Sequence, residues 1–226
     1  MPKLSNQLPL PLTIEDAYLW ETFVVSPSNE EAFLHLKAWM DWETPFTLLL
    51  GAKGSGKTHI THVWSEEVDA YKVSSLEAPE KMFEDLNRKK NTHLAIDPLP
   101  HPLSPAQQET LFHLYNTVNR KQGRLLITID QPLILYDIQL KDLLSRLKAS
   151  HLVELFNPDD NLVRGLLVKN CSQHQIQIPS ATLDYLSVRI KRQYKEIHKT
   201  TEILIQEALA RKSALTIPFV KGVLSI

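Results

Sequence analysis

Cysteine is nearly absent from this sequence, because Cys171 is the only one in 226 residues. A disulfide needs two thiols, so none can form within one chain. An excess of charge of one sign is also lacking, with 25 Lys and Arg against 26 Asp and Glu. No overall positive field therefore attracts the chain to nucleic acid, and we expect no direct sequence-specific binding of DNA.

Long apolar runs are missing as well. No stretch approaches the roughly 20 apolar residues that a membrane-spanning helix needs, and no basic segment followed by an apolar core opens the chain. We therefore expect a cytoplasmic protein without membrane contact. The pairs His59 with His62 and Cys171 with His174 lack further ligands, so we expect no metal cage. With 43% hydrophobic residues, the chain can still bury a real core.

The most informative segment that is present is Gly51-Ala52-Lys53-Gly54-Ser55-Gly56-Lys57-Thr58. It matches the phosphate-binding pattern G-x-x-x-x-G-K-[ST], and it lies between a predicted strand at 46–50 and a predicted helix at 59–68. Glycine lets backbone N–H groups turn around an anion, and the helix dipole adds attraction. We therefore predict that ADP or ATP binds here, held by Gly51, Gly54, Ser55, Gly56, Lys57 and Thr58.

Within this loop, Lys57 would reach the β- and γ-phosphates, and the Thr58 hydroxyl would be a ligand of Mg²⁺. A second Mg²⁺ contact is predicted at Asp97, which ends the apolar run 93–96. An Asp in such a place can also be a simple turn residue. The next residue, where a second carboxylate would polarise the attacking water, is Pro98. We therefore expect weak ATP hydrolysis by the chain alone, or none.

Predicted strands and helices alternate through the first two thirds of the chain. The predicted strands are 46–50, 71–73, 93–96, 125–130 and 152–155, and helices are predicted at 32–40, 59–68, 79–90, after Ser104, and at 137–147. This alternation is typical of an α/β fold, with a mostly parallel sheet flanked by helices and a ligand at the carboxyl ends of the strands. We assign residues 13–156 to this nucleotide-binding domain.

Two local features of this domain are also expected. Ser28 followed by Glu31 predicts a capping box for the first helix. Its apolar residues would face the core, namely Ala32, Phe33, Leu36, Trp39 and Met40. The run 23–25 favours a short strand. At the end of the strand 125–130, Thr128 or Asp130 would sense the γ-phosphate. Either residue can equally cap a helix or a turn.

Residues 157–226 predict helices only, and we assign them to a small helical lid. Asn157 is the expected cap and Pro158 the start of its first helix, and further helices are predicted at 183–190, 193–211 and 218–224. Arg192, Lys195 and Lys199 would fall on one side of the lid. Such a stripe is usually solvated, although one of its cations can reach the nucleotide.

Residues 1–12 form a proline-rich arm that contains Gln7-Leu8-Pro9-Leu10-Pro11-Leu12. Proline favours extended backbone, so the arm can present its leucines with little loss of entropy on docking. Two interpretations stay open from the residues: the arm fills a groove on a partner, or it packs on its own domain.

Four separated stretches resemble, in order, the ATPase domain of the bacterial replication initiator DnaA, an AAA+ protein. They are 23–29, 50–60, 127–132 and 142–147. DnaA carries an origin-binding helix-turn-helix region behind this domain, whereas this sequence stops at Ile226 after the lid. Together with the arm, which is similar to a clamp-binding peptide, and with 215–221, this difference makes the chain resemble the Hda family of regulators that inactivate DnaA.

The resemblance implies a P-loop AAA+ domain and a negative regulator of replication initiation. Its partners would be DnaA and the β sliding clamp of DNA polymerase III, bound through Gln7, Leu8, Leu10, Pro11 and Leu12, and a homo-oligomer is possible. Arg146 would be an arginine finger that acts in trans on ATP bound to DnaA. Without the resemblance, Arg146 would be a helix-end arginine that neutralises the dipole.

The resemblance also assigns residues around the chain's own nucleotide, which would be mainly a structural ligand. Phe23, Val24, Val25 and Asn29 are similar to the segment beside the adenine, and Arg192 matches the lid residue that contacts phosphate, with Lys195 as the second choice. Asp130 would lie near the phosphates. The competing interpretation is a helicase-loader-like ATPase that acts on DNA. Pro98 and the lack of a basic-aromatic groove pattern argue against it.

Overall fold

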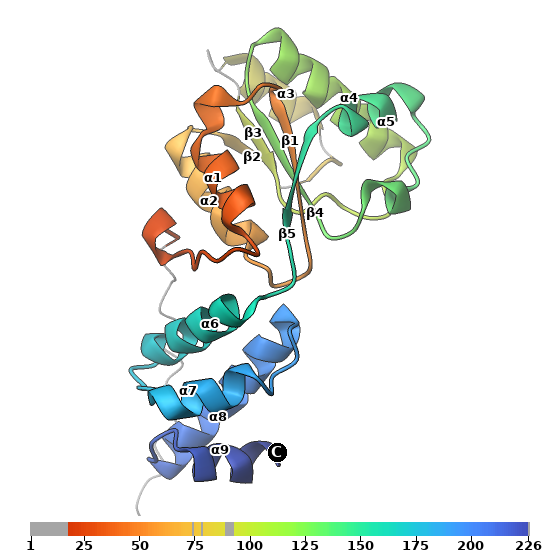
Figure 1. Ribbon diagram of the computed structural model, residues 1–226. Helices are drawn as coiled ribbons and strands as arrows, with labels where there is room; N and C mark the ends of the chain where they lie inside the picture. The colour runs from red at the N-terminus through yellow and green to blue at the C-terminus, as the bar shows by residue number, and fades with distance from the viewer. Residues whose placement is uncertain (1–17, 74, 78, 89–92, 226) are drawn as a thin grey trace, which may run out of the picture.

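The computed structural model describes residues 18–73, 75–77, 79–88 and 93–225. The predicted clamp-binding residues 7–12 lie outside the described residues. The centre of the fold is a five-stranded sheet in the order β2-β3-β4-β1-β5, in which every pair is parallel (Figure 1). Its strands are β1 Phe46–Gly51, β2 Tyr71–Val73, β3 Leu94–Ile96, β4 Leu125–Ile129 and β5 His151–Leu155. Their carboxyl ends therefore meet at one edge of the sheet.

Helices cover both faces of the sheet because the strands bury side chains on both. Along β1, Phe46 and Leu48 join the core under one face, whereas Leu49 joins the core under the other. The first face packs against α3 Pro79–Arg88, α4 Pro105–Arg120 and α5 Lys141–Lys148, and the second against α1 Glu30–Lys37 and α2 Lys57–Glu67. Short 3-10 helices lie at Trp20–Thr22, Trp39–Asp41 and Leu133–Tyr136.

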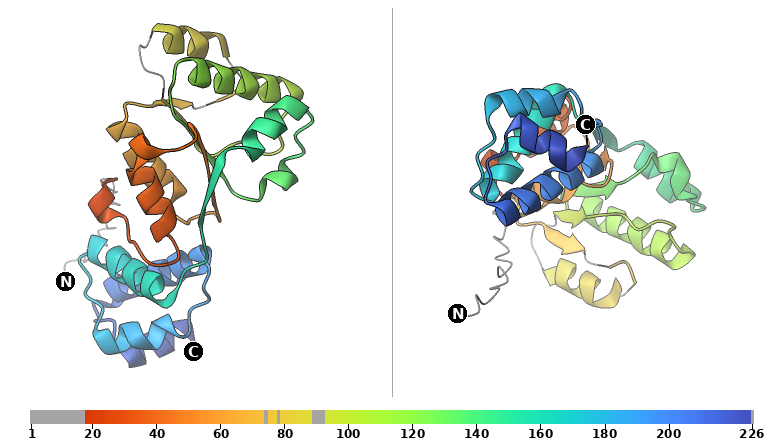
Figure 2. Two further views of the ribbon diagram at one scale, coloured as in Figure 1. Left: turned by 45° about the horizontal axis from the view of Figure 1, so that its top comes forward. Right: turned by 90° about the horizontal axis from the view of Figure 1, so that it is seen from below.

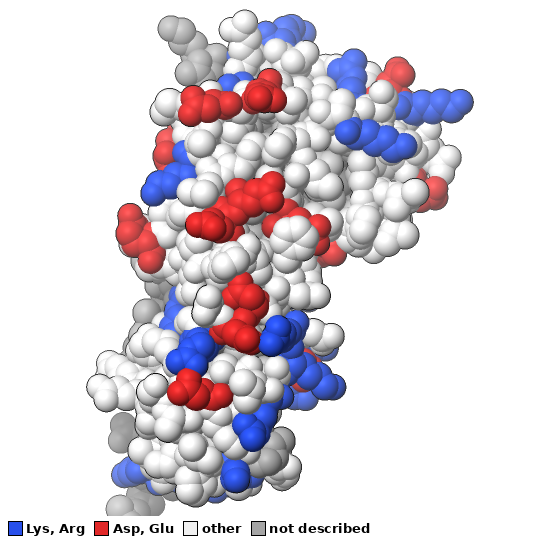
Figure 3. Space-filling model, in the orientation of Figure 1, with Lys and Arg blue, Asp and Glu red and all other residues white. Residues whose placement is uncertain are grey.

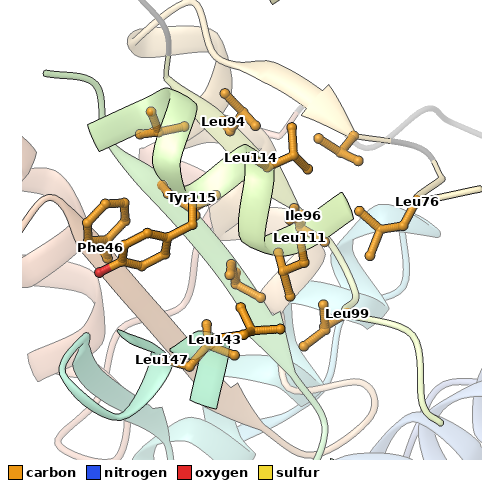
Figure 4. Packing of buried hydrophobic residues seen from close by; sticks show 14 of the residues in the cluster. Phe46, Leu76, Leu94, Ile96, Leu99, Leu111, Leu114, Tyr115, Leu143 and Leu147 are labelled. Carbon is orange, nitrogen blue, oxygen red and sulfur yellow. The ribbon is translucent and has the colours of Figure 1, made fainter. Parts of the chain in front are cut away.

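The helix α4 supplies much of the packing on the first face. Figure 4 shows Leu111, Leu114 and Tyr115 of this helix pointing into the core, where the Tyr115 ring stacks on Phe46 with 3.6 Å between centroids. The start of α4 is set by the sequence-predicted capping box. Ser104 Oγ accepts from Gln107 N at 3.2 Å, and Gln107 Oε1 accepts from Ser104 N at 2.9 Å. The predicted cap at Ser104 is therefore confirmed.

The C-terminal third is a separate layer of helices below the sheet domain (Figures 1 and 2). These are α6 Asp160–Gln173, α7 Ser180–Ser187, α8 Tyr194–Arg211 and α9 Ile217–Leu224. They share a core of their own, with Leu167, Leu186 and Ile197 fully buried within it. The predicted fold class, an α/β domain with a parallel sheet and a small helical lid, is confirmed. Among the described residues, no helix is long and apolar enough to cross a membrane.

Several local predictions about the first domain are wrong. Residues 23–25 form no strand, because Phe23 packs beside α2 rather than next to a sheet edge. No capping box forms at Ser28: α1 has Asn29 at its N-cap, without a side-chain cap bond. That helix ends at Lys37, and Met40, expected in the core, is 70% exposed.

Two further helix starts differ from prediction. The helix predicted at 137–147 begins only at Lys141, because Asp137 has a left-handed backbone with φ of 48°, which breaks the helix. The first lid helix begins at Asp160 rather than at Pro158. Its N-cap is Asp159, whose Oδ1 accepts from Leu162 N at 2.8 Å. Asp159 has the extended backbone of an N-cap, with φ of −77° and ψ of 175°, so the helix starts directly after it.

Candidate nucleotide-binding site

A cleft of about 510 Å³ lies at the carboxyl edge of the sheet, where the sheet domain meets the lid. Three parts of the chain line it: the phosphate-loop residues 53–58, the segment 18–29 before α1, and the helices α6 and α8 of the lid. Asp97, Pro98 and Asp130 close it at the ends of β3 and β4. The cleft therefore brings together most of the residues that the sequence predicts for a nucleotide site.

The glycines of the loop are required by its geometry. Gly54 and Gly56 have φ of 84° and 95°, which residues with a side chain rarely adopt. A Cβ at Gly51 would lie 2.6 Å from Ser55 Oγ, and one at Gly56 would lie 3.0 Å from the Phe23 ring. Gly56 is also the N-cap of α2, so the loop ends directly on a helix N-terminus, which attracts anions.

Lys57 is buried and folded back on this loop. Its Nζ donates to the carbonyl oxygens of Gly51 at 2.6 Å and Ala52 at 3.0 Å, and it pairs with Asp130 Oδ1 at 2.7 Å. Its side chain is 6% exposed, so this charge needs a partner, and Asp130 supplies one. A phosphate would be a second anion within reach of the same ammonium group.

Ser55 supplies an independent indication that the loop accepts a further polar group. Its Oγ is buried, and no described residue forms a hydrogen bond with it. A buried hydroxyl without a partner is costly, so such an atom indicates that the site takes up a polar ligand. A phosphate in the loop would satisfy this hydroxyl. The residues present therefore fit a nucleotide phosphate.

The Asp97 carboxylate is held by the neighbouring strand. Thr128 Oγ1 of β4 donates to Asp97 Oδ1, and Thr128 is fully buried. The next stretch is also tied to β4, since Leu99 N donates to Thr128 O at 2.9 Å. Thr128 thus orients Asp97, and it is Asp130 that contacts Lys57. From the sequence, Thr128 and Asp130 were each either a phosphate sensor or a cap, and these contacts give the two residues different surroundings.

The segment before α1 forms one wall of the cleft. Val24 and Phe23 line it, and the Phe23 ring stacks on Phe33 with 5.8 Å between centroids. Asn29 is 2% exposed and uses its amide within the segment, where Nδ2 donates to Val24 O and Oδ1 accepts from Ser26 N. Asn29 therefore shapes this wall. Val25 is 41% exposed and is not among the lining residues.

The same segment is bonded to the hinge of the lid, which is the connection 156–159 between β5 and α6. Ser28 N donates to Asp159 Oδ2 at 3.0 Å, so Asp159 caps α6 and also holds the segment. Burial would raise the pKa of Asp159, but hydrogen bonds from Leu162, Ser26 and Ser28 outweigh it and lower the pKa. Asp159 therefore links this wall of the cleft to the first turn of α6, so a displacement of the wall would be transmitted to the start of the lid.

A second tie comes from α8. Tyr194 Oη donates to Phe156 O at 2.8 Å. Burial, with a smaller effect of Asp159, raises the pKa of Tyr194 to about 12, so the phenol stays a neutral donor at physiological pH. The N-terminal end of α8 is therefore anchored at the hinge, beside the phosphate loop.

The lid residues at the cleft are not the ones that the sequence predicts. Lys169 and Asn170 of α6 and His198 of α8 line it. Arg192 instead pairs with Asp160 Oδ1 at 2.8 Å, and neither Arg192 nor Lys195 is among the lining residues. Their assignments stay predictions. Helical spacing offered the missed signal, since His198 follows the buried Tyr194 by four residues and so shares its face.

Arg146 lies outside the cleft, on α5. Its guanidinium donates to Asn116 Oδ1 of α4 and lies over the rings of Phe112 and Tyr115, with 4.7 and 5.4 Å from Cζ to the centroids. It is not among the residues that line the chain's own cleft. Arg146 therefore takes no part in forming this cleft, and its assignment as a finger stays a prediction.

Comparison with known proteins finds a described family for the lid and relatives for most of the chain. Residues 160–224 match the family described as "Hda, lid domain". An uncharacterized protein of Haemophilus influenzae is 28% identical over 233 residues, which cover 99% of this chain and 100% of that protein. The chromosomal replication initiator DnaA of Campylobacter concisus is 25% identical, over 93% of this chain and 53% of DnaA. The chain thus spans about half the length of the DnaA relatives it matches.

Solved structures of replication initiators share the fold. Domain III of Thermotoga maritima DnaA superposes with a TM-score of 0.71 at 20% identity, covering 92% of this chain and 95% of that one. A DnaA bound to AMPPCP and single-stranded DNA has a TM-score of 0.68 at 21% identity, covering 88% and 69%. The predicted resemblance is confirmed. With its phosphate loop, parallel sheet and helical lid, this chain resembles the DnaA-related AAA+ proteins, and its lid matches the family of Hda lid domains.

Proposed function

We propose that the chain is a nucleotide-binding negative regulator of replication initiation. It binds ADP or ATP in the cleft and stimulates hydrolysis of the ATP carried by DnaA. The observation that supports this most directly is the loop around Lys57, whose glycine conformations and unpartnered Ser55 hydroxyl suit a polyphosphate. A Mg²⁺ ion would be held with the nucleotide by Thr58 and Asp97, where it would neutralise phosphate charge.

The chain's own cleft is poorly equipped for hydrolysis. Asp97 and Asp130 are the carboxylates that line it within the described part of the chain, and both are engaged, by Thr128 and by Lys57. Pro98 follows Asp97 and cannot accept a proton from water. The nucleotide would therefore act mainly as a structural ligand, which sets the relation between the cleft wall and the lid hinge.

Arg146 is proposed as the finger that acts in trans. A cation supplied to a neighbour's phosphates stabilises the charge of the transition state and is worth about 10³ to 10⁵ in rate in GTPases. The structure supports a role outside the chain's own cleft, because Arg146 lies against α4. Tethering to the β sliding clamp of DNA polymerase III through residues 7–12 would keep the regulator at replicating DNA.

The experiment compares DnaA-bound ATP hydrolysis with the wild-type chain, Arg146→Ala and Lys148→Ala, each with ADP and clamp present. Lys148 is an exposed cation two residues away on the same helix, so it is a matched control for charge. We expect Arg146→Ala to lose the stimulation, whereas Lys148→Ala keeps it. Equal stimulation by Arg146→Ala and wild type would refute the finger. A deletion of residues 7–12 that still binds clamp would refute the tether.

A further inference from the structure

Beside the nucleotide cleft lies a second hollow, a groove of about 620 Å³ between residues 21–24 and the lid helix α6. Phe23, Val24 and Lys169 line both hollows, so the groove shares a wall with the cleft. The residues that α6 contributes to the groove are Arg164, Gly165, Val168, Lys169, Ser172 and Gln173. Because they recur at helical spacing, they form one stripe along one face of the helix. At about 1.5 Å per residue, this stripe is about 14 Å long.

The walls of the groove are apolar where they come together. Val168, in the middle of the stripe, is 45% exposed, and Phe23 and Val24 belong to the other wall. Gly165 keeps the two walls close, because a Cβ there would lie 2.5 Å from Val24 Cγ1. Polar side chains stand at the two ends of the stripe. An exposed apolar groove with polar edges is typical of a surface that binds a peptide segment.

The chain's own arm is connected close to this groove. The described structure begins at Tyr18, and the lining of the groove begins at Glu21. Residues 13–17 link the arm to this point, and five extended residues span at most about 17 Å. Proline favours extended backbone, in which Leu8 and Leu12 would be about 12 Å apart. The leucines of the arm therefore suit the stripe in length and in chemistry.

The link and the lid differ in the sign of their charge. The link contains Glu15 and Asp16, whereas the arm contains no acidic residue. Lys169 lies at the groove, although Glu21 lines it too. Residues 157–226 carry ten Lys and Arg against six Asp and Glu, and Figure 3 shows cations on the lid, below a band of acidic side chains at the junction of the two domains. The lid therefore attracts the acidic link, which brings the arm toward the groove.

We propose that residues 7–12 dock in this groove of the same chain, with their leucines against Val168 and against the wall formed by Phe23 and Val24. Docking buries apolar surface, and the stiff backbone of the arm keeps the entropy cost low. The leucines cannot contact a partner while they lie in the groove, so docking inhibits the arm. This inference goes beyond the proposed function, and only its effect on the sliding clamp rests on the proposed tether.

Docking within one chain needs little intrinsic affinity. A short link gives an effective concentration of about 1 mM, so a segment that binds as a free peptide with a dissociation constant of about 0.1 mM would be docked about ten times as often as released. The apparent affinity of the arm for a partner is reduced accordingly, because only the released fraction can bind. Release of the arm should therefore raise that affinity about tenfold.

Titration with a fluorescent peptide of residues 1–17 tests the docking. The peptide is added to the full-length chain with Leu8→Ala, Leu10→Ala and Leu12→Ala, in which the groove is open. We expect it to bind this open chain about tenfold more tightly than wild type, whose own arm competes for the groove. Equal affinity for the two chains would overturn the proposal.

Variants of the groove locate the binding. In the open chain, Val168→Glu places a charge in the apolar stripe and Ser172→Trp fills the groove, so each should weaken peptide binding about tenfold. Val188→Glu is the matched control, because Val188 is a 71% exposed valine of the lid that does not line the groove. We expect less than a twofold change for it. Equal peptide binding by the Val168→Glu and Val188→Glu chains would also overturn the proposal.

Two more measurements test the inhibition and the identity of the occupant. With the wild-type arm, Val168→Glu should strengthen clamp binding about tenfold and Val188→Glu should leave it unchanged, and equal clamp binding by both would refute the inhibition. Clamp binding by none of the chains would refute the proposed tether, while the peptide titration would still decide the docking. A wild-type dimer in sedimentation that Val168→Glu abolishes would assign the groove to the arm of a second copy and overturn docking within one chain.

Discussion

The contact between Val24 and Gly165 is the sharpest place to test the geometry of the cleft. Gly165 lies inside α6, where the wall segment crosses the lid helix, and a Cβ there would be 2.5 Å from Val24 Cγ1. Alanine in place of glycine stabilises a helix interior by about 1 kcal/mol, but the forced shift of Val24 costs typically 1–3 kcal/mol. We predict that Gly165→Ala lowers the free energy of unfolding by about 1 kcal/mol and weakens nucleotide binding, because Val24 lines the cleft.

Two matched variants make this prediction decisive. Gly222 lies in α9, where a Cβ would meet no atom within 4 Å, so Gly222→Ala should raise the free energy of unfolding by about 0.5–1 kcal/mol. Adding Val24→Ala to Gly165→Ala removes the colliding methyl groups, and the pair should show a favourable coupling energy. Urea unfolding and titration with fluorescent ADP measure both effects. A Gly165→Ala variant as stable as Gly222→Ala, or zero coupling with Val24→Ala, would mean that the segment does not pack on α6 as described.

Two further predictions concern buried polar groups. Burial, with the charge of His151 as a second cause, lowers the pKa of His35 to about 4. The folded state therefore resists protonation of His35. We predict that up to about 2–3 kcal/mol of stability, present above pH 6.5, is lost as the pH falls toward 4. Urea unfolding over a pH series measures this loss, and the same dependence of stability on pH in His35→Gln as in wild type would contradict the prediction. Thr61 Oγ1 is buried without a partner among the described residues, whereas Thr201 Oγ1 donates to Ile197 O at 2.7 Å. Thr61→Val should thus be neutral or stabilising and Thr201→Val destabilising by about 1 kcal/mol, and equal melting temperatures would refute the difference.

The fold was largely predictable because its signals are local. The loop at 51–58, the strand at 125–130 and the cap at Ser104 each depend on neighbours within a few residues, and β1, β4 and α4 form where these patterns predict them. Predictions failed where a distant contact or an unusual backbone conformation overrode the local preference. Ser28 has the residue type of a cap, yet its backbone N–H is used by Asp159, 131 residues away. Asp137 adopts a left-handed backbone that no spacing of apolar residues reveals.

The residues of the candidate site also fall into those that the sequence predicts and those that only the folded chain identifies. By itself, the amino-acid sequence determined the phosphate loop, the carboxylate at Asp97 and the lack of an acid at Pro98, because each follows from residue type at a fixed spacing. Only the tertiary structure decided which lid residues meet the loop: His198 and Gly54 are 144 residues apart, and their contact depends on how α8 is anchored at the hinge. A basic stripe in the sequence shows that cations are available, but only the packing of the two domains decides which lid side chains line the cleft.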